Sequence, residues 1–141
     1  MGWPDTETEM RVIVDTNVLI RAVVRDDEKQ ARAAAKLLKS AEVIAVSLPC
    51  LCEFVWVLRR VYGFGQQDIS SALDALLQAG NVVVDRPAAD AGLAVLNAGG
   101  DFADGLIAHE GKWLGGETFV SFDKKAVSLI AAQGIHARLL V

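Results

Sequence analysis

The stretch Arg11-Val12-Ile13-Val14-Asp15-Thr16-Asn17-Val18-Leu19-Ile20 decides how the rest of the chain is interpreted. A short apolar run ends at a carboxylate, and apolar residues then return with helical spacing. We therefore predict a buried strand over 11–14 and a helix over 16–24, with Asp15 at the junction. In an open parallel sheet, ligands bind beyond the carboxyl ends of the strands, so Asp15 is predicted to lie where chemistry takes place.

Beyond this stretch the chain alternates between strand and helix patterns. Further strands are predicted over 42–46, 81–84, 118–121 and 137–140, and further helices over 26–41, 49–61, 66–79, 87–98, 101–113 and 123–133. Such alternation is typical of βαβ units. We predict a three-layer α/β/α fold with a central parallel sheet, formed by 11–141, and a disordered polar tail over 1–10.

Bulk composition narrows the class of protein. A chain of 141 residues, 52% of them hydrophobic, is long enough for one domain with a core. No apolar run approaches the ~20 residues of a membrane span, and we find no signal-peptide pattern. Cys50 and Cys52 lie two apart in an apolar segment, so we expect buried thiols in a reducing cytoplasm.

The net charge of −4 is uneven along the chain. All 14 lysines and arginines lie from Arg11 onward, whereas three of the 18 acids precede it. If five of the remaining acids share one site, the surface outside that site carries an excess of positive charge. The sequence therefore leaves room for a polyanionic partner, provided that cations neutralise the acidic site.

Five carboxylates occupy element boundaries or apolar surroundings: Asp15, Glu53, Asp101, Asp104 and Asp123. If the strands over 11–14, 42–46 and 118–121 are neighbours, right-handed crossovers bring Asp15, Glu53 and Asp123 to one edge. Asp104 then needs only to face inward from its helix.

Several of these residues also have a purely structural interpretation. Asp15, Asp101 and Asp123 each fit a helix N-cap, and Asp104 follows Asp101 at capping-box spacing. Glu53 fits a structural role least. It is the only charged residue between Pro49 and Leu58 and has no basic neighbour three or four positions away. If buried, its carboxylate requires a metal or a distant cation.

Converging carboxylates repel one another unless a cation lies among them. Oxygen ligands favour Mg²⁺ or Mn²⁺, and no His/Cys set suggests zinc, since His109 and His136 fit structural or surface roles. Such a site suits phosphodiester hydrolysis, in which the metal polarises the phosphoryl group and activates water.

Four segments resemble the motifs of PIN domains, most closely the VapC-type toxins of bacterial toxin–antitoxin pairs. The segments are Val12-Ile13-Val14-Asp15-Thr16-Asn17, residues 48–63 around Glu53, Gly100-Asp101-Phe102-Ala103-Asp104-Gly105-Leu106-Ile107-Ala108, and Val120-Ser121-Phe122-Asp123. The resemblance extends from about Met10 to Val141.

The resemblance implies a metal-dependent endoribonuclease that forms a homodimer and is inhibited by a cognate antitoxin. Asp15, Glu53, Asp104 and Asp123 match the acidic quartet of the family, and Asp101 matches an acid found in part of it. Asn17 matches a residue that orients the first carboxylate. Ser121 replaces a common Thr and keeps the hydroxyl, whereas Gly105 replaces a common Ala and is expected to loosen the helix start.

Further residues extend this interpretation. The predicted helix 49–61 is apolar around most of its circumference, which favours burial against both the sheet and a second subunit. Candidates for phosphate contact, chosen by charge alone, are Arg21, Arg25, Arg59, Arg60, Lys112, Lys124 and Lys125.

Two other functions remain open. One is an aspartyl-phosphate phosphatase with Asp15 as nucleophile, although Asn17 stands where such enzymes commonly have a second acid. The other is a degenerate PIN fold that binds RNA or protein without cutting, against which the intact acidic set argues.

Overall fold

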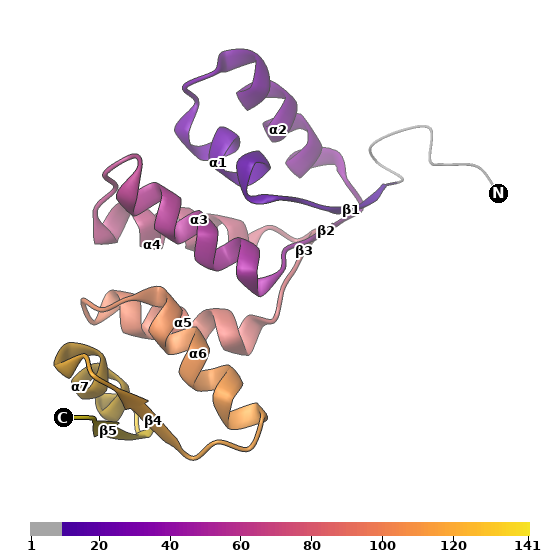
Figure 1. Ribbon diagram of the computed structural model, residues 1–141. Helices are drawn as coiled ribbons and strands as arrows, with labels where there is room; N and C mark the ends of the chain where they lie inside the picture. The colour runs from indigo at the N-terminus through magenta and orange to yellow at the C-terminus, as the bar shows by residue number, and fades with distance from the viewer. Residues whose placement is uncertain (1–9) are drawn as a thin grey trace. The chain divides into compact units, whose positions relative to one another are not determined.

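The computed structural model describes residues 10–141, so the predicted tail over residues 1–9 lies outside the described residues (Figure 1). The chain forms two compact units, and each is described by itself. The first comprises the described residues up to Gly65 together with 71–84, and the second comprises 66–70 with 85–141.

The first unit contains a parallel sheet in the order β1-β2-β3, with Val12 opposite Ile44 and Ile44 opposite Val82. Its strands are β1 (Arg11–Ile13), β2 (Val43–Ala45) and β3 (Val82–Val83), and its helices are α1 (Thr16–Val24), α2 (Glu28–Ser40), α3 (Leu48–Arg60) and most of α4 (Gln66–Gln78). Figure 1 shows α1 and α2 on one side of this sheet and α3 on the other. The predicted α/β/α layering with parallel strands is confirmed.

Short polar caps begin the helices of this unit immediately beyond the strand ends. The last sheet bond of β1 runs from Val14 N–H to the Ala45 carbonyl, and Asp15 then caps α1. Ser47 caps α3 in the same way, with Pro49 in the first turn, where a missing N–H costs nothing. Both helices therefore start at the carboxyl edge of the sheet.

The second unit is built around α7 and a two-stranded parallel sheet. Its elements are α5 (Arg86–Asn97), α6 (Phe102–Trp113), β4 (Thr118–Ser121), α7 (Lys124–Ala132) and β5 (His136–Leu139). Val95, Ala108 and Ile130 form its core, one from each helix, and Phe119 and Ala137 pack against them from the strands.

Helices α5 and α6 approach each other closely at two glycines. A Cβ at Gly92 would lie 2.6 Å from the ring of Phe102, and a Cβ at Gly105 would collide with the Ala91 carbonyl oxygen. Gly105 was expected only to loosen the helix start, but its missing side chain also has a packing role, because it lets α6 lie close to α5.

Every predicted element is present, with ends that differ by one or two residues. The structure corrects the supposition that β4 lies beside β1 and β2 in one sheet. β4 pairs in register with β5, from Thr118 with His136 to Ser121 with Leu139, whereas β1 pairs with β2 in the other sheet. Met10 was assigned to the tail, but its carbonyl accepts hydrogen bonds from Glu42 and Val43 and extends the first sheet. No helix in residues 10–141 is long and apolar enough to cross a membrane.

Candidate functional site

The first unit places Asp15 and Glu53 around one pocket. Asp15 caps α1 by accepting a 3.3 Å bond from Val18 N–H at Oδ1, and Glu53 projects from α3. The pocket measures ≈ 330 Å³, and its walls are formed by Val14, Asp15, Thr16, Asn17, Ser47, Pro49, Cys50 and Glu53. Two of the predicted site carboxylates, together with Asn17, therefore face the same space.

Glu53 reaches this pocket from an exposed position, so the argument that it is a buried carboxylate in need of a partner is wrong. The buried face of α3 is formed by Cys50, Leu51, Phe54, Val55 and Leu58. Glu53 lies on the opposite face together with Trp56, which is 58% exposed. The apolar sequence around Glu53 covers a core that its own side chain does not enter.

Cys50 forms part of the pocket wall, and the charges of both carboxylates act on its thiol. It is buried, and Thr16 Oγ1 donates a 3.8 Å hydrogen bond to its Sγ. Burial raises the pKa of the Cys50 thiol, the bond from Thr16 lowers it in part, and the charges of Glu53 and Asp15 raise it further. The pocket therefore has a negative potential that would attract a cation. Cys52, which was predicted to be buried, is only half-buried.

The second unit brings Asp101, Asp104 and Asp123 into one electrostatic cluster. Asp104 lies in the first turn of α6 and is half-buried, whereas Asp101 and Asp123 are exposed. Burial raises the pKa of Asp104, and the charges of Asp101 and then Asp123 raise it further. Asp104 is therefore a carboxyl group whose ionised form is destabilised by its surroundings.

Asp101 and Asp123 also cap helices, as their structural interpretation predicted. Asp101 Oδ1 accepts from Ala103 N–H at 3.2 Å, and Asp123 Oδ1 accepts from both Lys125 and Ala126 at 2.9 and 3.1 Å. Within residues 10–141, the second carboxylate oxygen of Asp123 makes no hydrogen bond. Capping therefore leaves an oxygen for another ligand, so the structural role does not exclude the functional one.

Ser121 stabilises the turn that leads from β4 into the Asp123 cap. It ends β4, and its Oγ accepts a 3.0 Å bond from the Asp123 backbone N–H. This bond fixes the turn between the strand and α7, so a hydroxyl at this position serves the same purpose whether Ser or Thr supplies it.

A family model for the PIN domain matches residues 12–131, which include all five predicted acids. The chain belongs to the PIN-domain family. No curated protein matches the chain. PIN domains are generally nucleases that act on RNA and typically use divalent metals, which agrees in kind with the carboxylates described above.

The donor atoms of this PIN domain fit a hard cation. All five predicted ligands are carboxylates, which suit Mg²⁺ or Mn²⁺, and the raised pKa of Asp104 marks a place where positive charge would be stabilising. Within residues 10–141, however, no three His, Cys, Asp or Glu side chains are grouped as a ready metal site. Neither histidine completes such a group among these residues. His109 is half-buried on α6, and His136 is exposed on β5.

Basic residues of this PIN domain include a group that the sequence analysis missed. Arg21 and Arg25, chosen there by charge alone, are engaged with Asp26 and Glu28. Lys29, Arg32, Lys36 and Lys39 are exposed along α2. Their spacing of three, four and three residues places them on one helix face, a signal that was visible in the sequence.

Proposed function

We propose that this PIN domain is a metal-dependent endoribonuclease that hydrolyses RNA phosphodiester bonds. The observation that supports this most directly is Asp104, which is half-buried beside two other carboxylates and has a raised pKa. A carboxyl group in such surroundings is a common feature of functional sites. A bound divalent cation would restore its ionised form.

In this proposal Asp15, Glu53, Asp104 and Asp123 serve one reaction and hold Mg²⁺ or Mn²⁺, with Asp101 as a further ligand. The cation supplies Lewis-acid polarisation of the phosphate and activation of water. Asn17 lines the pocket of Asp15 and Glu53, where it would orient a carboxylate. Ser121 would position Asp123 through the bond to its backbone.

The finer assignment is a toxin of the VapC type, acting in the cytoplasm and inhibited by a cognate antitoxin. It is supported by the motif resemblance and by family membership. A homodimer is part of the same proposal, and exposed apolar residues of α3 and its C-cap support it, since Trp56 is 58% and Val61 62% exposed. Light scattering at micromolar concentration tests the dimer, and a monomeric chain would contradict it.

The test of the nuclease is cleavage of total RNA in Mg²⁺, in Mn²⁺ and in EDTA, with Asp104→Asn beside the unmodified protein. The matched control is Asp74→Asn, which removes the same charge from an exposed position on α4. We expect metal-dependent cutting that Asp104→Asn abolishes and Asp74→Asn retains. No cutting by folded, inhibitor-free protein in any metal would contradict the proposal and favour a binding module.

A further inference from the structure

A second pocket begins at Asp15 and extends along α1 and α2. It measures ≈ 370 Å³, within the range of ligand sites, and is formed by Asp15, Asn17, Val18, Arg21, Gln30, Ala33, Ala34 and Leu37. Half of these side chains are polar and half are apolar. The α1–α2 groove, as we name this pocket, therefore combines hydrogen-bonding groups with an apolar wall beside a predicted site carboxylate.

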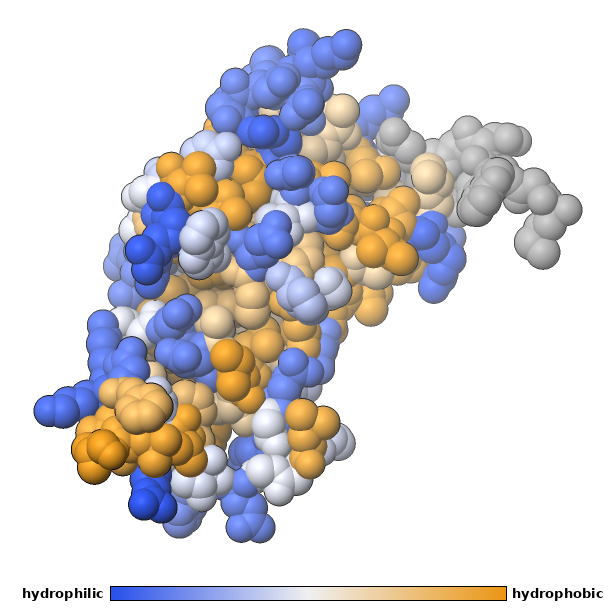
Figure 2. Space-filling view, in the orientation of Figure 1, coloured by the Kyte–Doolittle hydropathy of each residue, from blue (hydrophilic) through white to orange (hydrophobic). Residues whose placement is uncertain are grey.

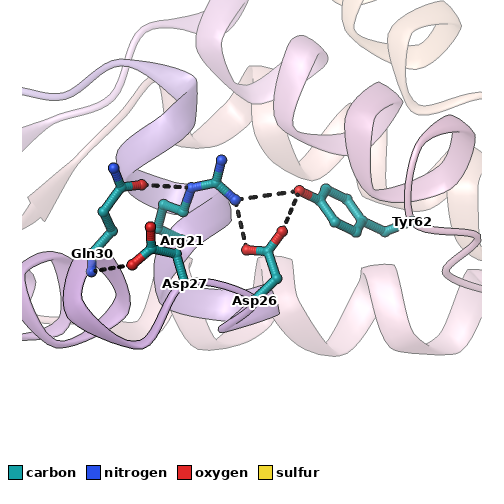
Figure 3. A network of polar contacts seen from close by, with 5 residues as sticks. All are labelled: Arg21, Asp26, Asp27, Gln30 and Tyr62. Carbon is teal, nitrogen blue, oxygen red and sulfur yellow. Dashed lines mark hydrogen bonds and ion pairs between the residues drawn. The ribbon is translucent and has the colours of Figure 1, made fainter.

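Arg21 is held rigidly in this groove by three neighbours (Figure 3). Its Nε donates to Gln30 Oε1 at 2.9 Å, and its Nη1 donates to Asp26 Oδ1 at 2.6 Å and to the Tyr62 hydroxyl at 3.4 Å. Tyr62 in turn donates to the other oxygen of Asp26 at 3.1 Å. Arginine is charged at any physiological pH, and the bonds to Tyr62 and Asp26 raise the pKa of Arg21 further.

One nitrogen of this guanidinium remains available. Among the described residues, Nη2 of Arg21 makes no hydrogen bond, and Figure 3 shows it pointing away from the other labelled side chains. An arginine fixed on one side with donors left on the other is preorganised for an anion, since little side-chain freedom remains to be lost on binding.

The outer face of α2 carries four cations next to the groove, the α2 basic stripe of Lys29, Arg32, Lys36 and Lys39. Within the described part of the chain none of them has an ion-pair partner. Each of the first three is followed by a residue that lines the groove, namely Gln30, Ala33 and Leu37. The stripe therefore borders the groove along α2.

This concentration of charge contrasts with the rest of the molecule. The chain has a net charge of −4, yet the one acid of α2, Glu28, pairs with Arg25. Figure 2 shows hydrophilic side chains gathered over the first turns of α2. Four unpaired cations along one face of an otherwise acidic protein give that face a positive potential, which would attract an anionic partner.

We infer that the α1–α2 groove and the α2 basic stripe bind single-stranded RNA and lead it toward Asp15. The stripe and Arg21 contact successive backbone phosphates, and the groove receives one nucleotide against Val18, Ala33 and Leu37. The groove contains no aromatic side chain, so binding there depends on phosphate and polar contacts rather than on stacking of bases. This inference rests on the proposed function, because it assigns the substrate path of that reaction.

The test measures binding of a fluorescein-labelled single-stranded RNA of about 12 nucleotides by anisotropy, in EDTA so that the RNA stays intact. The variant is Arg32→Gln/Lys36→Gln, and the matched control is Arg86→Gln/Arg138→Gln, which lowers the charge equally from exposed positions outside α2. Two lost phosphate contacts reduce the salt exponent by about 1.4, which weakens binding by about 25-fold at ~0.1 M salt. The control should bind as the unmodified protein does.

Equal affinities and equal salt slopes for both variants would overturn the inference. If the stripe variant keeps its RNA affinity but no longer binds a co-expressed protein inhibitor, α2 is a protein interface and the RNA assignment is wrong. Cleavage assays on the same proteins separate the two proposals. If the unmodified protein cuts RNA and the stripe variant cuts it equally well, the nuclease proposal stands and the substrate path is wrong. If the stripe variant binds RNA more weakly but no protein cuts RNA, the nuclease proposal is wrong and α2 remains only an RNA-binding surface.

Discussion

Gly105 of α6 lies directly against the backbone carbonyl of Ala91 in α5, in a space where no side chain fits. Gly105→Ala therefore forces the two helices apart. We expect the free energy of unfolding to fall by about 1–3 kcal/mol, the usual cost of inserting a methyl group into a tight contact. Urea denaturation followed by circular dichroism measures this change.

The matched control is Gly111→Ala in the same helix. A Cβ at Gly111 meets nothing within 4 Å, so only helix propensity changes there. This substitution should stabilise the protein by up to about 1 kcal/mol. Equal effects at the two positions would show that the α5–α6 contact at Gly105 does not limit stability.

The raised pKa of Asp104 predicts a stability change with pH. The folded chain holds the Asp104 proton more tightly than the unfolded chain, so the free energy of unfolding falls as the pH rises from the ordinary value of 3.8 through the raised pKa. Without divalent metal, Asp104→Asn lacks this fall and should gain stability relative to the unmodified protein between acidic and neutral pH. Urea unfolding in EDTA at a series of pH values measures the difference.

Asp74→Asn is the control for this pH series, because it removes a carboxylate from an exposed position on α4. Adding Mg²⁺ or Mn²⁺ at neutral pH should raise the melting temperature of the unmodified protein and raise that of Asp104→Asn less. A pH profile for Asp104→Asn parallel to that of the unmodified protein would contradict the assigned burial and charge repulsion.

The two cysteines should react at different rates with a thiol reagent. Burial and the charges of Glu53 and Asp15 raise the pKa of Cys50, so little reactive thiolate is present at neutral pH. In Cys52→Ala protein, Cys50 should react more slowly than Cys52 does in Cys50→Ala protein, because Cys50 is also the more buried of the two thiols. Faster reaction of Cys50 than of Cys52 would contradict the burial of the Cys50 thiol beside Glu53 and Asp15.

Tyr62→Phe should loosen Arg21 without removing its charge. The variant loses the hydroxyl that donates to Asp26 and accepts from Arg21, with little effect on stability because both partners are accessible to solvent. Partial desolvation raises the pKa of Asp26, but bonds from Arg21 and Tyr62 lower it further, so its net pKa is below the usual value. Nuclear magnetic resonance titration of Asp26 should show this pKa rise in the variant, and an unchanged value would refute the network.

Local patterns were sufficient to predict most of this fold. Apolar periodicity and caps such as Asp15 and Ser47 located the helices to within two residues, because they reflect local hydrogen bonding. The division of the strands between a β1-β2-β3 sheet and a β4-β5 pair was not predictable in the same way. Whether β4 joins β1 depends on packing between segments far apart in the sequence, which no local pattern encodes.

The errors at the site have the same origin. Glu53 was treated as buried because its neighbours in sequence are apolar, yet burial on a helix depends on which face packs. The spacing of Glu53, Trp56 and Arg60 marked the exposed face, and the same rule would have revealed the basic stripe on α2. The close approach at Gly105 depends on the crossing of two helices and left no trace in its own segment.

The capping aspartates, which the proposed function also makes metal ligands, have an evolutionary consequence. Asparagine caps a helix about as well as aspartate, so replacing Asp15 or Asp123 by Asn removes a charge while the hydrogen bonds to the helix remain possible. Under the proposed function, a duplicated copy of this chain can therefore lose its catalysis through one substitution and still be inherited as a folded protein. Inactive descendants could then arise without an unfolded intermediate.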